Sequence, residues 1–222
     1  GHNNYGQLGD SSTTNRHSPV QVMKNKKVID IVNGYDHTLF LTEDGKVYGC
    51  GRNDQGQLGD GTSSNRSTPV LVDLPDLNII AIGASFHNSY FITDNYELYV
   101  TGYNQYGELG RGNKTKVTTP VKTNINDEEI MKVVGGNYYT VVLTKSNKMY
   151  LTGRNNEGQL GTLTSDESER TKFELFETDY KIADIATGLE NTFFITDEFK
   201  AYGFGRNDVG QLGEHSKFKR YD

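Results

Sequence analysis

A nine-residue motif that returns at a nearly constant spacing constrains this 222-residue chain more than any other feature. The motif reads Gly-x-Asn-x-x-Gly-(Gln/Glu)-Leu-Gly, and its copies begin at Gly1, Gly51, Gly102, Gly153 and Gly205. Near-identical copies about 51 residues apart predict a repeat architecture, in which each unit packs on its neighbours. The approximate repeats are 1–50, 51–101, 102–152 and 153–204, with a partial fifth at 205–222.

Three short segments between successive motifs have the pattern of β-strands. In the first repeat an apolar segment at 28–32 precedes an alternating segment at 38–42, which ends in Thr. The dipeptide Asp44-Gly45 is a favoured hairpin turn, and it leads to a third segment at 47–51. The same order returns in the later repeats, so the sequence predicts one antiparallel meander per repeat.

A fourth, outer segment follows the motif in each repeat. It begins with Pro at Pro19, Pro69 and Pro120, whereas the last copy has Phe173 in this region. Pro is tolerated on an edge strand because an edge position need not donate a ladder hydrogen bond. Four short strands per repeat predict an all-β fold, a β-propeller with four blades and the start of a fifth repeat, and we treat 1–222 as a single propeller segment.

Composition narrows the classes of partner. The net charge of −6 and the pI of about 5.4 argue against a nucleic-acid partner, and the basic clusters at 24–27 and 217–220 are too short to change this. Cys50 is the single cysteine, which excludes an internal disulfide and favours a reducing compartment. No apolar run reaches the ~20 residues of a membrane span. We therefore expect an intracellular protein, cytoplasmic or nuclear, without membrane insertion.

Residues with catalytic or metal-binding patterns are scarce. The five histidines lack ligand spacing, and the densest carboxylate group, at 166–169, is interpreted as a solvated loop. The motif glycines and asparagines are interpreted as structural, because no phosphate-loop pattern accompanies them. We expect no catalytic residues, no metal and no cofactor. The chain starts inside a motif and without Met, so it is expected to be a piece of a longer protein.

Variation between the repeats is concentrated in one loop, directly after the apolar segment and before the alternating strand. Symmetry-equivalent loops lie at one end of a propeller, so these residues are expected to form one aromatic-rich surface. Aromatic side chains dominate protein interfaces. An alternative is that some of them plug the central channel. The candidate partner-binding residues are Tyr35, Asp36, His37, Phe86, His87, Asn137, Tyr138, Leu189 and Glu190.

The nonamer, together with Gly34-Tyr35-Asp36-His37-Thr38, resembles the regulator of chromosome condensation repeat family over essentially the whole chain. The resemblance implies a seven-bladed propeller, whose remaining blades come from the rest of the chain or from another chain. In the exchange-factor branch the acid–His pair contributes to the GTPase-facing surface. Asp36 and His37 match that pair, and Glu190 matches it in part.

Three functions follow as hypotheses, since members of this family are used for different purposes. The first is a scaffold module whose loops bind a protein partner without chemistry. The second is a guanine nucleotide exchange factor for a Ran-like small GTPase. Against it, the even spacing of the motifs leaves no room for an inserted wedge between these blades. The third is an effector or inhibitor that occludes another protein's active site.

Overall fold

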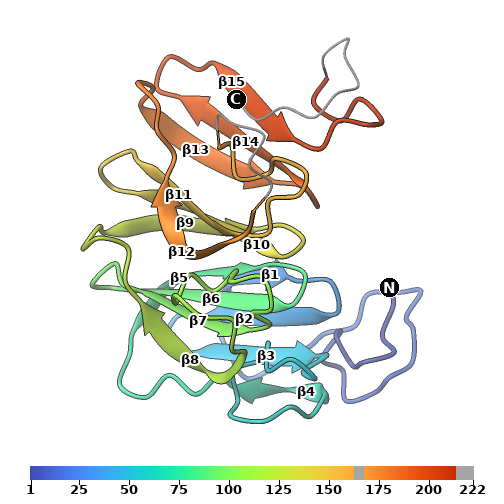
Figure 1. The fold of residues 1–222 in the computed structure, drawn as a ribbon. Helices are drawn as coiled ribbons and strands as arrows, with labels where there is room; N and C mark the ends of the chain where they lie inside the picture. The colour runs from blue at the N-terminus through green and yellow to red at the C-terminus, as the bar shows by residue number, and fades with distance from the viewer. Residues whose placement is uncertain (163–167, 214–222) are drawn as a thin grey trace. The chain divides into compact units, whose positions relative to one another are not determined.

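A computed structural model describes residues 1–162 and 168–213 of the chain (Figure 1). Asp166, Glu167 and the basic cluster at 217–220 lie outside the described residues. The regular elements in the described residues are all strands. They are β1 (Val28–Asn33), β2 (His37–Thr42), β3 (Val47–Gly51), β4 (Arg66–Leu71), β5 (Ile79–Ala84), β6 (Asn88–Thr93), β7 (Leu98–Gly102), β8 (Val117–Thr123), β9 (Ile130–Gly135), β10 (Tyr139–Thr144), β11 (Met149–Gly153), β12 (Arg170–Leu175), β13 (Ile182–Thr187), β14 (Asn191–Thr196) and β15 (Ala201–Gly205).

The strands form antiparallel sheets in chain order, and each four-stranded sheet takes its first three strands from one repeat and its outer strand from the next. The orders are β1-β2-β3-β4, β5-β6-β7-β8, β9-β10-β11-β12 and, within the described residues, the three-stranded β13-β14-β15. We call these sheets blades 1 to 4. The predicted all-β fold and its blades are confirmed, and Phe173 lies in an outer strand as expected.

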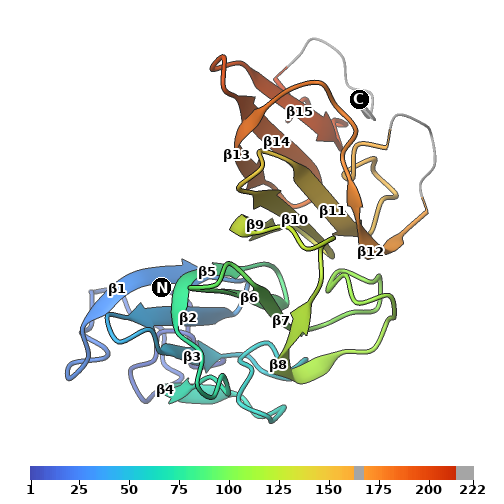
Figure 2. The same ribbon diagram turned by 90° about the vertical axis from the view of Figure 1, so that its left-hand side faces the viewer.

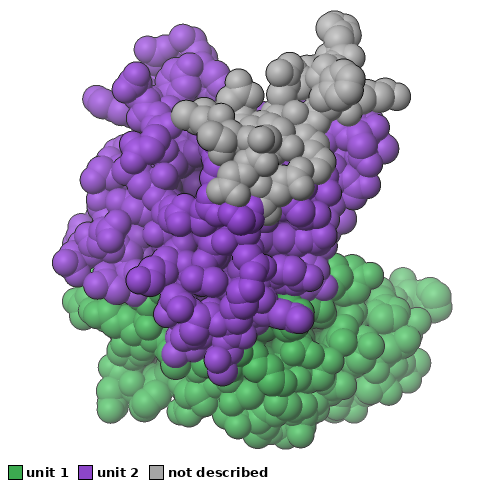
Figure 3. All heavy atoms as spheres, in the orientation of Figure 1, with its two compact units in different colours: residues 1–103, 116–123 green, residues 104–115, 124–222 purple. Residues whose placement is uncertain are grey.

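The chain divides into two compact units, drawn in different colours in Figure 3. Unit 1 comprises residues 1–103 and 116–123 and contains blades 1 and 2. Unit 2 comprises residues 104–115 and 124–222 and contains blades 3 and 4. Each unit thus holds one complete junction between two blades.

In each unit the core lies between its two blades. The second strands of blades 1, 2 and 3 are buried at every position. In unit 1, Leu39 and Leu41 of blade 1 pack with Ile82 and Phe91 of blade 2. Figure 2 shows the ribbons of these two blades, β1–β4 and β5–β8, from a second side. In unit 2, apolar residues of β10 pack with residues of β13 and β14 in the same way. Burial of apolar surface is the main term that holds such blades together.

Each of the first four nonamers is fixed to the blade that follows it by a hydroxyl group. The hydroxyl belongs to the second residue of that blade's second strand, and it donates to the backbone carbonyl of the motif's Gln or Glu. The distances are 2.8 Å for Thr38 to Gln7, 2.6 Å for Ser89 to Gln57, 2.7 Å for Thr140 to Glu108 and 2.8 Å for Thr192 to Gln159. Within each unit, the motif therefore joins one blade to the next.

Candidate functional site

The variable loops are held in place by the motif that follows them. Gly51 has φ +105°, and a side chain there would lie 2.4 Å from the carbonyl oxygen of Asp36. The N–H of Arg52 donates to that same carbonyl at 2.8 Å. Only glycine allows so close an approach at this backbone angle. The same contact recurs between Arg206 and Glu190 at 2.9 Å, so it positions loops in both units.

The motif itself is braced by a buried asparagine. Asn53 is fully buried, and its side-chain oxygen accepts the N–H of Leu58 at 2.9 Å. Its amide donates to the carboxylate of Asp60 at 2.9 Å and to the carbonyl of Thr62 at 3.2 Å. Asn104 makes equivalent bonds in unit 2. These bonds satisfy polar groups that would otherwise be buried without partners.

Two of the predicted aromatic residues stack in unit 1. The rings of Tyr35 and Phe86 lie 4.1 Å apart and nearly parallel, and His87 meets Phe86 edge-on at 4.6 Å. The side chain of Tyr35 is 63% exposed, whereas Phe86 is half-buried beneath it. The sequence predicted an aromatic-rich surface at these positions, and in the stacked pair Tyr35 is the exposed ring. We call Tyr35, Asp36, Phe86, His87 and Arg52 the loop face of unit 1.

Asp36 lies at the base of this loop face and is 7% exposed. Its carboxylate is 3.7 Å from the guanidinium of Arg52, and it accepts from the amide of Gln7 at 3.4 Å. Arg52 also binds Asp54 through two nitrogens, at 2.9 and 2.8 Å, and lies over the ring of Tyr5. The Arg52 guanidinium therefore fixes the acidic and aromatic side chains around it.

His37 lies in the junction between blades 1 and 2 and is 1% exposed. Its Nε2 is 3.0 Å from the hydroxyl of Ser89 in the next blade. Burial, and then the nearby His87, lower the pKa of His37 to about 3, so the ring is neutral at ordinary pH. In this position His37 joins two blades and does not face solvent.

The equivalent loops of unit 2 carry different side chains. Leu189 is 65% exposed, and its carbonyl accepts the N–H of Asn137 at 2.6 Å. Tyr138 is half-buried against Tyr106, with ring centroids 5.1 Å apart, and has φ +67°. The loop face of unit 2 comprises Asn137, Tyr138, Leu189, Glu190, Arg154 and Arg206.

Arginines organise this second loop face too. The carboxylate of Glu190 is 2.8 Å from Arg206 and 3.5 Å from Arg154. Arg206 also pairs with Asp208 at 2.7 Å, and Arg154 lies over the ring of Tyr106. Sequence reasoning missed the arginines, although position 2 of the motif is Arg in three of the five copies. That position differs between copies just as the loops do, which is the signal that could have found them.

No group of three or more His, Cys, Asp or Glu residues in 1–162 and 168–213 is arranged to hold a metal ion. In the same part of the chain, no helix has the length and apolar character needed to cross a membrane.

Comparison with protein families identifies the class of fold. The family model for the RCC1-like domain matches residues 1–221, so the chain belongs to that family. In the solved structures, human WBSCR16 superimposes with a TM-score of 0.86 at 23% identity, over 99% of this chain and 59% of that one. Prp20p from Saccharomyces cerevisiae gives 0.81 at 20% identity, over 91% and 51%. These likenesses support the propeller fold.

Among curated proteins, several relatives of different function are similar to this chain. The human X-linked retinitis pigmentosa GTPase regulator is 34% identical over 131 residues, which is 57% of this chain and 12% of the relative. The ultraviolet-B receptor UVR8 of Arabidopsis thaliana is 29% identical over 219 residues, 96% of this chain and 49% of the relative. Human HERC2, an E3 ubiquitin-protein ligase, is 29% identical over 93% of this chain and 4% of its own length. The chain thus spans half or less of each relative's length.

Proposed function

We propose that this chain is a protein-binding module that captures its partner on the loop face of unit 1 and carries out no chemistry of its own. The observation that carries the proposal is the exposed Tyr35 ring stacked on Phe86. Because the two rings already hold each other in place, this largely apolar surface loses little side-chain entropy when a partner binds. The ion pair of Arg52 with Asp54, both partly exposed, adds charge to the same loop region, and aromatic residues together with Arg are the composition expected of an interface.

The arrangement of constant and variable residues supports the same function. From one repeat to the next, the buried strand positions and the motif Asn stay the same in character, whereas the side chains on the loop faces change. A propeller separates these tasks, because the blades hold the loops rigidly and the loop side chains determine what is bound. The single cysteine, Cys50, is buried and unpaired, which suits a partner met inside the cell.

A capture experiment tests this function. Tyr35 and Phe86 are changed together to Ala in the tagged chain, and proteins retained from an extract of its own cells are quantified. We expect the retained partner to fall at least tenfold, as loss of interface hot spots requires. Phe199→Ala is the matched control, since this aromatic is 92% exposed and lies in the turn between β14 and β15. If the wild-type chain, the loop-face variant and Phe199→Ala retain equal amounts of partner, the loop face of unit 1 is not the binding surface.

A guanine nucleotide exchange factor is the second candidate. It is favoured by the relative named as a GTPase regulator and by Prp20p, whose structure is described together with its binding to Gsp1p. Such a protein would act by contact, by stabilising the nucleotide-free GTPase. The test is release of fluorescent GDP from a Ran-type GTPase, with this chain and with the full natural protein. Faster GDP release than from the GTPase alone, reduced by Tyr35→Ala, supports exchange activity. A release rate equal to that of the GTPase alone, even with the full natural protein, eliminates the exchange-factor function.

A further inference from the structure

A pocket of about 350 Å³ lies in unit 1, where the chain crosses over from blade 1 to blade 2. All of its lining residues fall between Gly45 and Ile79, inside unit 1, and its volume is within the range of ligand-binding pockets. Its walls are the turn between β2 and β3, the end of β4 and the crossover loop at 72–78. Because the loop face of unit 1 precedes β2 and this turn follows it, the pocket lies at the opposite end of blade 1.

The floor of the pocket belongs to the core between the two blades. Val47, Val72, Leu74 and Ile79 line the pocket and are buried in the core cluster of unit 1. Leu77 also lines it and packs, half-buried, against the same cluster. An apolar group placed in this pocket would therefore extend the blade junction and be removed from water.

The crossover loop forms a fixed rim above this floor. The N–H of Leu77 donates to the carbonyl of Leu74 at 3.4 Å and closes a tight turn. Pro75 and Asp76, which has φ +58°, occupy the two central positions, as in a type II turn. The rim is thus already ordered, and binding there would lose little backbone entropy.

Uncompensated carboxylates surround the pocket. Asp73 lines it, and Asp76 and Asp94 are exposed in the crossover loop and in the turn between β6 and β7. Asn78 joins these two segments by donating to the carboxylate of Asp94 at 3.1 Å. In the part of the chain that the structure describes, none of the three carboxylates takes part in an ion pair. Lys46 is the one basic residue among those that line the pocket, so negative charge is in excess.

The next crossover, before β9, shows how the repeat neutralises such charge. There Glu128 and Glu129 are paired with Lys148 at 2.7 Å and Lys145 at 3.3 Å, both in the turn that follows β10. In the corresponding turn of blade 2 the two lysines are replaced by acidic residues, at positions 97 and 94. The crossover between blades 1 and 2 therefore lacks the lysines that would compensate it.

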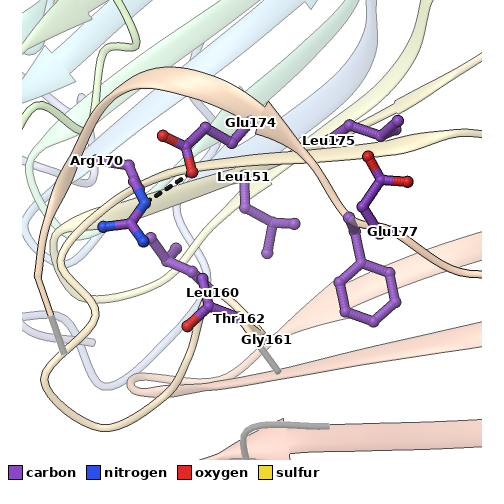
Figure 4. A pocket seen from close by; sticks show the side chains of 9 residues that line it. Leu151, Leu160, Gly161, Thr162, Arg170, Glu174, Leu175 and Glu177 are labelled. Carbon is purple, nitrogen blue, oxygen red and sulfur yellow. Dashed lines mark hydrogen bonds and ion pairs between the residues drawn. The ribbon is translucent and has the colours of Figure 1, made fainter. Parts of the chain in front are cut away.

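A pocket of about 230 Å³ in unit 2 gives a second comparison (Figure 4). Its lining includes Arg170 and Glu174, whose side chains pair with each other at 2.7 Å. That ion pair needs no group from outside the chain. In unit 1 the carboxylate of Asp73 has no such partner within the described residues, so the larger pocket has a charge that a ligand would complement.

We propose that Val72, Asp73, Leu74, Asp76 and Leu77, the crossover site, bind an extended segment of a partner protein in which a large apolar side chain stands beside Lys or Arg. The apolar side chain enters the pocket and packs on Leu74 and Leu77, and the basic side chains meet Asp73 and Asp76. The net charge of −6 on the whole chain favours approach of a basic segment. This site is separate from the loop face of unit 1 and does not depend on its function.

Immobilised octapeptides with a central Leu, Phe or Ala, flanked on both sides by either Lys or Glu, test the proposal. We expect the labelled chain to bind the Lys-flanked Leu and Phe peptides about tenfold more tightly than the Glu-flanked or the Ala peptides. Asp73→Asn with Asp76→Asn should abolish the preference for Lys, and Asn tolerates the positive φ at position 76. Asp179→Asn with Glu198→Gln makes the same charge change at exposed positions in unit 2 and should leave the preference intact.

Methyl resonances locate the bound peptide. Those of Leu74 and Leu77 should shift saturably with the Lys-flanked Leu peptide, and equally in the Tyr35→Ala, Phe86→Ala chain, where the loop face of unit 1 is lost. Equal binding of the Ala peptides would overturn the proposal, because charge alone would then suffice. Shifts confined to other residues, or an unchanged preference after the two Asp substitutions, would overturn it too. An uncharged apolar compound that shifts these methyl groups while no peptide does would assign the pocket to a small ligand instead.

Discussion

In unit 1 the loops before β2 and β6 present two stacked rings, whereas in unit 2 the loops before β10 and β14 present one exposed Leu beside a cluster of ion pairs. One backbone contact beneath these loops is common to both units. Arg52 and Arg206 each donate from the backbone to the preceding loop and each bind an acidic residue of that loop. The comparison shows that the repeat fixes where a loop lies, and that a few side chains decide what it can bind.

If the buried asparagine braces the motif in the same way in both units, removing it should lower the stability of the chain equally in either unit. Asn53→Ala and Asn104→Ala should each lower the free energy of unfolding by about 3 kcal/mol, because each leaves several buried polar groups without partners. Urea denaturation measures this, with exposed Ser63→Ala as control. A large loss for one variant and none for the other would show that the units do not share a framework.

Unit 2 contains the one copy of the motif with Glu, Glu108, at the position where the other four copies have Gln. Glu108 is 1% exposed, and its Oε1 has no hydrogen-bond partner. Burial raises the pKa of this carboxyl from 4.5 to about 8. The unfolded chain therefore loses the proton at lower pH than the folded chain, so stability falls as the pH rises from 4.5 to 8 and is level on either side of that window.

Glu108→Gln should abolish that fall and stabilise the chain above pH 8. At ~1.4 kcal/mol for each pKa unit, reduced by relaxation around the charge, the gain is about 2 kcal/mol. Urea midpoints at pH 5, 7 and 9 measure it. Gln57→Glu is the reciprocal change in unit 1, at a fully buried position, and should introduce the same pH dependence. Parallel pH profiles for the wild-type chain and Glu108→Gln would refute the assignment.

The hairpin turns give the smallest expected difference. Gly45 in unit 1 and Phe199 in unit 2 occupy equivalent positions, with φ +70° and +62°. A bulky residue is strained at this angle, and Phe199 is 92% exposed, so it has little packing to lose. Phe199→Gly should raise the melting temperature, with a gain of about 1 kcal/mol.

Asn147 provides the control for that turn. It also has positive φ, at +61°, but its side chain donates to the carbonyl of Ile182 at 2.9 Å. Asn147→Gly should therefore bring no gain, because relief of strain is offset by a lost hydrogen bond. If both variants stabilise the chain equally, local backbone strain alone determines the effect.

The sequence was sufficient for the fold because the period of the motif and the alternation in each strand are local patterns. It also identified the loops, since these differ where the rest of the repeat agrees. It could not determine side-chain burial within a loop. Asp36 and His37 are next to exposed Tyr35 in sequence, yet both are buried, one against Arg52 and the other against Ser89 of the next blade. Such contacts join residues of different repeats, and no pattern within one repeat reveals them.

The central claim is that the loop face of unit 1 binds the partner. Its most direct test is the affinity of the captured partner for two matched variants. Tyr35→Ala with Phe86→Ala removes the stacked rings of unit 1, and Tyr138→Ala with Leu189→Ala removes the apolar side chains of the loop face of unit 2. Titration calorimetry of the purified partner with each chain gives both dissociation constants. We expect the first variant to weaken binding at least thirtyfold, ~2 kcal/mol, and the second less than threefold. Equal losses, or a larger loss for the second variant, would contradict the assignment of binding to the loop face of unit 1.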